Sequence, residues 1–146
     1  MNPLYKHQDD AIEMALRNNG NAALFLEPGL GKTRTCLEIF KGLRRDDMFL
    51  KLLVVCPLSL INSAWGEDIK KFTDYTYIPF KDMKETLPDI IAINYESLIS
   101  KKYLSKIEEI VKNYPFMCVL DESARLKNPR SITSQVLLRL SRFFKH

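Results

Sequence analysis

The sequence lacks the features that would place this chain in a membrane or direct it to one. Its 146 residues contain no run of eighteen apolar residues, the minimum expected of a membrane-spanning helix. The first ten residues, MNPLYKHQDD, do not have the charged-then-apolar order of a signal peptide. We therefore expect no membrane partner and a cytoplasmic location, or a nuclear one in a eukaryote.

Cysteine is scarce, and its positions do not suggest a metal site or a disulfide framework. Cys36, Cys56 and Cys118 each lie in an apolar stretch, without the paired spacing of zinc ligands. We expect three buried, reduced thiols. The sequence also has no internal repeat, low-complexity segment or interdomain linker, so residues 1–146 are expected to form one domain. A net charge of +4 permits a nucleic-acid partner without requiring one.

The chain alternates short apolar runs with amphipathic segments. Continuous runs such as KLLVVCP and FMCVLD are typical of strands buried on both faces of a sheet. The pattern predicts an α/β domain with a mostly parallel sheet. We expect strands at 22–26, 51–57, 89–94 and 116–121, a short one within 75–80, and helices at about 6–18, 32–44, 58–72, 97–114 (as one or two helices) and 132–144.

A glycine-rich loop lies between an expected strand and an expected helix, in the segment ALFLEPGLGKTRTCLEIF. Gly29 and Gly31 allow successive backbone N–H groups to point inward around an anion, at the N-terminus of the next helix. Lys32 is placed to reach the β- and γ-phosphates, and the Thr33 hydroxyl to ligate Mg²⁺. The strict phosphate-loop pattern is incomplete, because Leu26 replaces its first glycine; a purely structural turn is the alternative.

A pair of carboxylates follows another expected strand. Asp121 and Glu122 come directly after the apolar run FMCVL, at the sheet edge where parallel strands place their ligands. Asp121 is the candidate for holding Mg²⁺ through water, and Glu122 for orienting or deprotonating the attacking water. The alternative is a solvated acidic loop. With the glycine loop present, we predict a site for magnesium and ATP, with Lys32, Asp121 and Glu122 as its catalytic residues.

Five segments occur in a characteristic order along the chain: LYKHQ, EPGLGKT, LLVVCPLSLINSAWGEDIKKF, IAINYESL and VLDESARLKN. Together they resemble the first RecA-like domain of superfamily 2 helicases, in the Snf-type DNA translocase branch. The resemblance implies a RecA-like fold with helices on both faces of the sheet, and an ATP hydrolase of the helicase or translocase type. It implies that Gln8 reads the adenine and that the phosphate loop consists of Glu27, Pro28, Gly29, Leu30, Gly31, Lys32 and Thr33.

The resemblance also implies contacts with a DNA backbone, of a duplex in particular. The residues that match these contacts are Pro57, Ser59, Asn94, Tyr95 and Lys127. Lys127 and Arg130 either add charge to this track or face solvent. Trp65, the only tryptophan, is expected to be a packing anchor rather than a base-stacking platform.

Three residues depart from the family pattern. Leu26 stands at the head of the phosphate loop, where a small or acidic residue is usual, and is expected to alter loop packing. Asn94 replaces a threonine, which puts one phosphate contact in doubt. Ala124 replaces the histidine of Asp-Glu-Ala-His, a residue that couples hydrolysis to the second domain.

No segment of the 146 residues resembles a second RecA-like domain with its arginine fingers. Such a domain is the partner that the resemblance implies, so we expect a fragment of a longer protein, nearly inactive in isolation. An RNA-directed helicase domain, a nucleotide- or DNA-binding module without turnover, and a small-molecule kinase are the alternatives. The SARLKN segment favours the DNA branch, and a kinase leaves the Cys-Pro-Leu-Ser segment unexplained.

Overall fold

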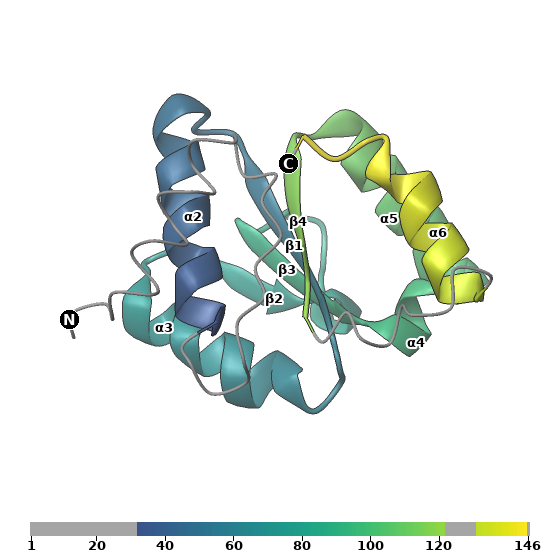
Figure 1. Cartoon of the computed structure of the whole chain (residues 1–146), viewed down its shortest axis with the longest axis horizontal. Coiled ribbons are helices and arrows are strands. Elements are labelled where there is room, and N and C mark those ends of the chain that lie inside the picture. The colour runs from purple at the N-terminus through teal and green to yellow at the C-terminus, as the bar shows by residue number, and fades with distance from the viewer. Residues whose placement is uncertain (1–31, 122–130, 146) are drawn as a thin grey trace.

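A computed structural model describes residues 32–121 and 131–145 of the chain. These residues form a four-stranded sheet with helices on both sides (Figure 1). The predicted helix at 6–18, the strand at 22–26 and the loop at 27–31 lie outside the described residues. The elements are α2 (Lys32–Asp46), β1 (Lys51–Cys56), η1 (Ile61–Gly66), α3 (Glu67–Phe72), β2 (Tyr77–Pro79), η2 (Phe80–Asp82), β3 (Ile90–Asn94), α4 (Tyr95–Leu98), α5 (Lys101–Asn113), β4 (Phe116–Leu120) and α6 (Ile132–Ser141).

All four strands run parallel, in the order β2-β3-β1-β4. β1 is the central strand of this arrangement and pairs with both β3 and β4. Its buried residues Leu52 to Cys56 form the continuous apolar run that a strand covered on both faces requires. The sequence prediction of an α/β domain with a mostly parallel sheet is therefore confirmed.

Alternating side chains of the strands enter two separate cores. In β1, Leu52 and Val54 pack with α2, η1 and α3, whereas Leu53 and Val55 pack with α4, α5 and α6. Figure 1 shows the same division, with α2 and α3 on one side of the sheet and α5 and α6 on the other. The period of two along each strand thus produces the three layers.

One helical prediction differs from the structure in detail: the segment 58–72, expected to be one helix, begins with the π-helical turn η1 before continuing as α3. The segment 97–114, expected to form one or two helices, contains two. The first, α4, begins already at Tyr95, and Ser100 caps α5 by accepting a hydrogen bond from the Tyr103 N–H. Among the helices of residues 32–121 and 131–145, none has the length and apolar character needed to cross a membrane.

Candidate active site

The parallel register brings three strand ends to one edge of the sheet. Cys56 at the end of β1 pairs with Asn94 at the end of β3, and Val55 pairs with Leu120 at the end of β4. Asp121 follows β4 directly, and its N–H donates to the Val55 carbonyl at 2.8 Å. Because this hydrogen bond extends the β1–β4 ladder by one residue, the position of Asp121 is fixed by the sheet itself.

The Asp121 carboxylate is buried, and each of its oxygens accepts a hydrogen bond from a different element. Only 7% of the residue is exposed to solvent. Lys32 Nζ, at the start of α2, donates to Oδ1 at 3.0 Å. Trp65 Nε1, in η1, donates to Oδ2 at 2.8 Å. The two residues that the sequence predicted as phosphate-binding lysine and metal-holding aspartate are therefore in direct contact.

Tyr95 reaches the same residue from the opposite side of the sheet. Its side chain is 3% exposed and belongs to the core beneath α4, α5 and α6. The hydroxyl donates to the main-chain carbonyl of Asp121 at 2.7 Å. Asp121 is thus bonded through its carboxylate, its carbonyl and its N–H, an arrangement that leaves its side chain little freedom.

Cys36 lies in α2 one helical turn after Lys32 and is buried. Burial raises the pKa of its thiol to about 12, while the nearby Lys32 ammonium acts in the opposite direction and Asp121 adds to the increase. Burial also raises the pKa of Cys118 to about 12. Neither thiol is a nucleophile at neutral pH. The prediction of buried, reduced thiols is confirmed for Cys36 and Cys56, whereas Cys118 is free but half-buried.

The oxygen ligands near Lys32 suit a magnesium ion that binds together with phosphates. Mg²⁺ is commonly held by one or two protein oxygens, several waters and substrate phosphates, rather than by an all-protein cage. The Asp121 carboxylate is a hard oxygen donor of this kind, and Thr33 lies next to Lys32 at the start of α2. Within the described ranges no group of three metal-ligating side chains occurs, so a closed structural metal site is not built here.

The residues predicted to contact DNA differ in their exposure. Ser59 is exposed and its carbonyl accepts a hydrogen bond from the Ser63 hydroxyl at 2.7 Å. Asn94 is half-buried and its amide donates to Glu96 Oε2 at 3.1 Å. Pro57 and Tyr95 are buried, and their contacts with DNA stay predictions.

Several predicted site residues cannot be placed. Gln8 and the loop residues Glu27, Pro28, Gly29, Leu30 and Gly31 lie outside the described residues, as do Glu122, Ala124, Lys127 and Arg130. Their roles stay predictions.

Sequence reasoning missed two contacts of Asp121, those made by Trp65 and Tyr95. Trp65 is fully buried in the core beneath α2, which confirms the predicted packing anchor. Its bond to Asp121 was not foreseen. The signal that could have indicated this bond was chemical. A buried indole N–H requires an acceptor, and few acceptors are expected among apolar strands.

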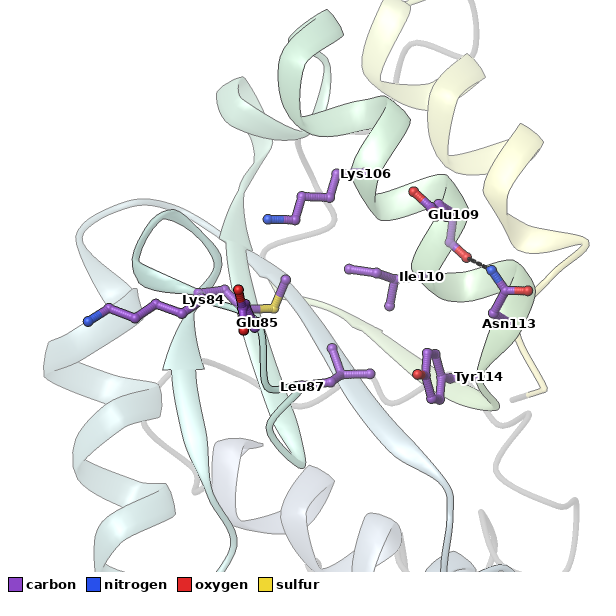
Figure 2. Close-up of a pocket in the computed structure, with 9 residues that line it drawn as sticks. Lys84, Glu85, Leu87, Lys106, Glu109, Ile110, Asn113 and Tyr114 are labelled. Atoms are coloured by element: carbon purple, nitrogen blue, oxygen red, sulfur yellow. Dashed lines mark hydrogen bonds between the residues drawn. The ribbon is translucent and has the colours of Figure 1, made fainter.

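A surface pocket of about 570 Å³ lies elsewhere, beside α5 (Figure 2). Its lining consists of Met83, Lys84, Glu85, Leu87, Lys106, Glu109, Ile110, Asn113 and Tyr114. None of these is a predicted site residue, and two lysines balance two glutamates. The pocket therefore does not include the Asp121 site, and the formal charges of its lining residues cancel.

Comparison with known proteins identifies the family. The model of the SNF2-related domain matches residues 7–143, nearly the whole chain. The chain belongs to the SNF2-related domain family. The resemblance to the first RecA-like domain of Snf-type superfamily 2 helicases is thereby confirmed.

Two curated proteins resemble this SNF2-related domain in sequence. A Caenorhabditis elegans homologue of SWI/SNF-related matrix-associated actin-dependent regulator of chromatin subfamily A-like protein 1 is 27% identical over 98% of the chain and 21% of its own length. The uncharacterized ATP-dependent helicase YqhH of Bacillus subtilis (strain 168) is 30% identical over 88% of the chain and 23% of its own length. The chain thus spans about a fifth of the relatives that it matches.

Two solved structures share the fold. The Sulfolobus solfataricus SWI2/SNF2 ATPase core in complex with dsDNA aligns with a TM-score of 0.73 at 24% identity, over 99% of this chain and 30% of its own. A structure named XPD_APO aligns with a TM-score of 0.61 at 24% identity, over 84% of this chain and 25% of its own. The RecA-like α/β fold expected from the sequence is confirmed.

Proposed function

We propose that this SNF2-related domain is the ATP-binding half of a motor that couples ATP hydrolysis to movement on DNA. The observation that carries the proposal is the 3.0 Å contact between Lys32 at the start of α2 and the buried Asp121 at the end of β4. A lysine and an aspartate at these two positions are the pair that a phosphate-loop ATPase uses for the phosphates and the metal. The helicase and chromatin-regulator names of the relatives support the same activity.

At the proposed site Lys32 exchanges partners when nucleotide binds. Its ammonium would leave Asp121 Oδ1 for the β- and γ-phosphates, and the Thr33 hydroxyl and the Asp121 carboxylate would hold Mg²⁺, Asp121 through water. Magnesium supplies positive charge against the charge that develops on the transferred phosphoryl group. Glu122 orients or deprotonates the attacking water, and Gln8 reads the adenine. These roles follow from the family pattern.

The proposed binding partner is duplex DNA, which the domain contacts along the sugar-phosphate backbone. Ser59 is exposed in the turn after β1, and Asn94 lies at the end of the adjacent β3. Both are at the sheet edge that carries Asp121, so one strand that follows this edge passes both. With Pro57, Tyr95 and Lys127 they form the proposed DNA track. The Sulfolobus SWI2/SNF2 ATPase core, which shares the fold, is in complex with dsDNA, and this supports the choice of duplex DNA.

The direct test is phosphate release with and without duplex DNA. For the 146-residue chain alone we expect weak nucleotide binding and little DNA-stimulated turnover, because the cationic groups of a second RecA-like domain stabilise the developing charge in such motors. Joined to that second domain, the chain is expected to hydrolyse ATP with DNA stimulation, and Lys32→Ala to abolish it.

Three results would contradict the proposal. Brisk, Lys32-dependent turnover by the 146 residues alone would refute the need for a second domain. Stimulation of the two-domain protein by duplex RNA and not by DNA would place the domain among RNA-directed helicases instead. Nucleotide binding with no turnover in the two-domain protein would identify a binding module.

A further inference from the structure

Asp121 receives side-chain hydrogen bonds from both segments that are predicted to contact DNA. Trp65 lies in η1, which follows the turn containing Ser59, and Tyr95 begins α4 beside Asn94. We propose that Trp65 and Tyr95 are positioning residues that fix Asp121 for the binding of magnesium and nucleotide. This inference rests on the proposed function, since it concerns the same carboxylate.

The Trp65 bond orients the carboxylate itself. The indole nitrogen is a donor only, and it lies 2.8 Å from Oδ2 in a fully buried side chain. A hydrogen bond to a charged oxygen in the interior is stronger than a neutral one, and the rigid ring allows few other geometries. Oδ2 therefore has a fixed direction, which in turn sets the direction of Oδ1.

The backbone that carries Trp65 has an unusual and well-supported form. Residues Ile61–Gly66 form a π-helical turn, in which the N–H of Glu67 bonds to the carbonyl of Asn62, five residues earlier. The Tyr77 hydroxyl donates to the Ile61 carbonyl at 2.6 Å. A side chain at Gly66 would meet that carbonyl at 3.3 Å and the Tyr77 ring at 3.5 Å. Such turns occur often at functional sites, and here the turn carries the side chain that bonds Asp121.

The two contacts of the carboxylate are not equivalent when nucleotide binds. The Lys32 side chain is 23% exposed and is proposed to move to the phosphates. Trp65 is fully buried and stays on Oδ2. The indole thus holds the orientation of Asp121 after its ion pair is lost. Tyr95 holds the main chain at the same residue, through the 2.7 Å bond to the Asp121 carbonyl.

The test compares ADP affinity with magnesium and with EDTA, in the 146-residue chain. Trp65→Phe and Tyr95→Phe each remove one donor to Asp121 and keep an aromatic ring. We expect each to reduce the magnesium-dependent gain in ADP affinity by about tenfold, as the loss of a hydrogen bond to a metal-binding residue does, with little effect in EDTA. Thr73→Val is the matched control: it removes a part-buried hydroxyl bond, to the Ile69 carbonyl in α3, that involves neither η1 nor Asp121.

The control separates positioning from a general loss of stability. All three variants are expected to lower the midpoint of thermal unfolding, but Thr73→Val is expected to keep the full magnesium-dependent gain. An unchanged gain in Trp65→Phe and Tyr95→Phe, with wild-type protein that binds magnesium and ADP, would overturn this inference alone. Wild-type protein that binds no nucleotide under either condition would overturn the proposed function as well.

A second measurement needs no variant. Because Trp65 is the only tryptophan, its indole N–H gives a single resonance in a ¹H–¹⁵N spectrum. That resonance is expected to shift more on addition of ADP with magnesium than on addition of ADP in EDTA, since the metal acts on the bonded carboxylate. Equal shifts under the two conditions would overturn the inference, even where Trp65→Phe fails to fold.

Discussion

The ion pair between Lys32 and Asp121 is predicted to weaken nucleotide binding, although both residues belong to the proposed nucleotide site. If Lys32 contacts phosphate as proposed, it has to leave Asp121 first, and the pair then opposes nucleotide binding when magnesium is absent. The two charges are 3.0 Å apart, with 23% of the lysine side chain and 10% of the aspartate side chain exposed. An exposed pair contributes about 0.2–1 kcal/mol. Because this pair is only partly shielded from solvent, we take about 1 kcal/mol, equivalent to roughly fivefold in a dissociation constant.

Asp121→Asn removes the charge and retains an oxygen for the Trp65 N–H. In EDTA we expect the variant to bind ADP about fivefold more tightly than wild type, by the same conversion. In magnesium we expect the reverse, since the metal has lost its carboxylate. Isothermal titration of ADP under the two conditions measures both effects on one preparation.

Repulsion between Asp121 and the phosphates acts in the same direction, so the ion pair needs its own control. In a Lys32→Met background no ion pair exists, and Asp121→Asn then reports the repulsion alone. The difference between the two backgrounds is the contribution of the pair. Equal or weaker ADP binding by Asp121→Asn in EDTA would refute the reasoning, as would an equal gain in both backgrounds.

Three further predictions concern other parts of the fold. Burial acts to raise the pKa of Asp89, but hydrogen bonds from the Thr76 backbone and from Arg44 hold that pKa below its usual value. The resulting stability is present above about pH 4 and is lost as the pH falls through the lowered pKa. Asp89→Asn should therefore reduce the fall of the thermal unfolding midpoint in acid. Ser59→Glu should weaken duplex DNA binding by roughly fivefold, a loss of about 1 kcal/mol, in anisotropy titrations at fixed salt, whereas a glutamate at the exposed Ser105 of α5 should not. Cys36 should resist iodoacetamide at pH about 8 in the native chain and react in urea, with labelling followed by mass spectrometry; native labelling would contradict its burial.

The strands were predictable because their signal is local. The apolar runs at 51–57, 89–94 and 116–121 are bounded by proline or charge, and the observed strands β1, β3 and β4 end within one residue of those limits. The π-helical turn was not predictable, since it depends on contacts between residues distant in sequence. Tyr77 bonds the Ile61 carbonyl from sixteen residues away, and neither residue has a composition that marks this pairing.

Those parts of the site that depend on where the strands end could be predicted from the sequence. Those that depend on the direction of a side chain could not. Lys32 and Asp121 were expected to meet, because parallel strands place their carboxyl ends at one edge. Tyr95 follows a strand at the same edge, and the family pattern assigned it to DNA. Successive residues around a strand end point to opposite faces, and Tyr95 points into the core, where its hydroxyl bonds the Asp121 carbonyl.

Trp65 has a contact that neither of the two roles weighed from the sequence includes. The sequence offered packing anchor or base-stacking platform, and the burial of the side chain agrees with the first. Burial alone does not complete the account, because an indole in the interior has a hydrogen-bond donor to satisfy. Of the acceptors near η1, the carboxylate of Asp121 is the one that it bonds. A residue placed for packing thereby gains a direct bond to the proposed metal-holding group, and η1, which follows the proposed DNA turn, cannot shift without moving that carboxylate.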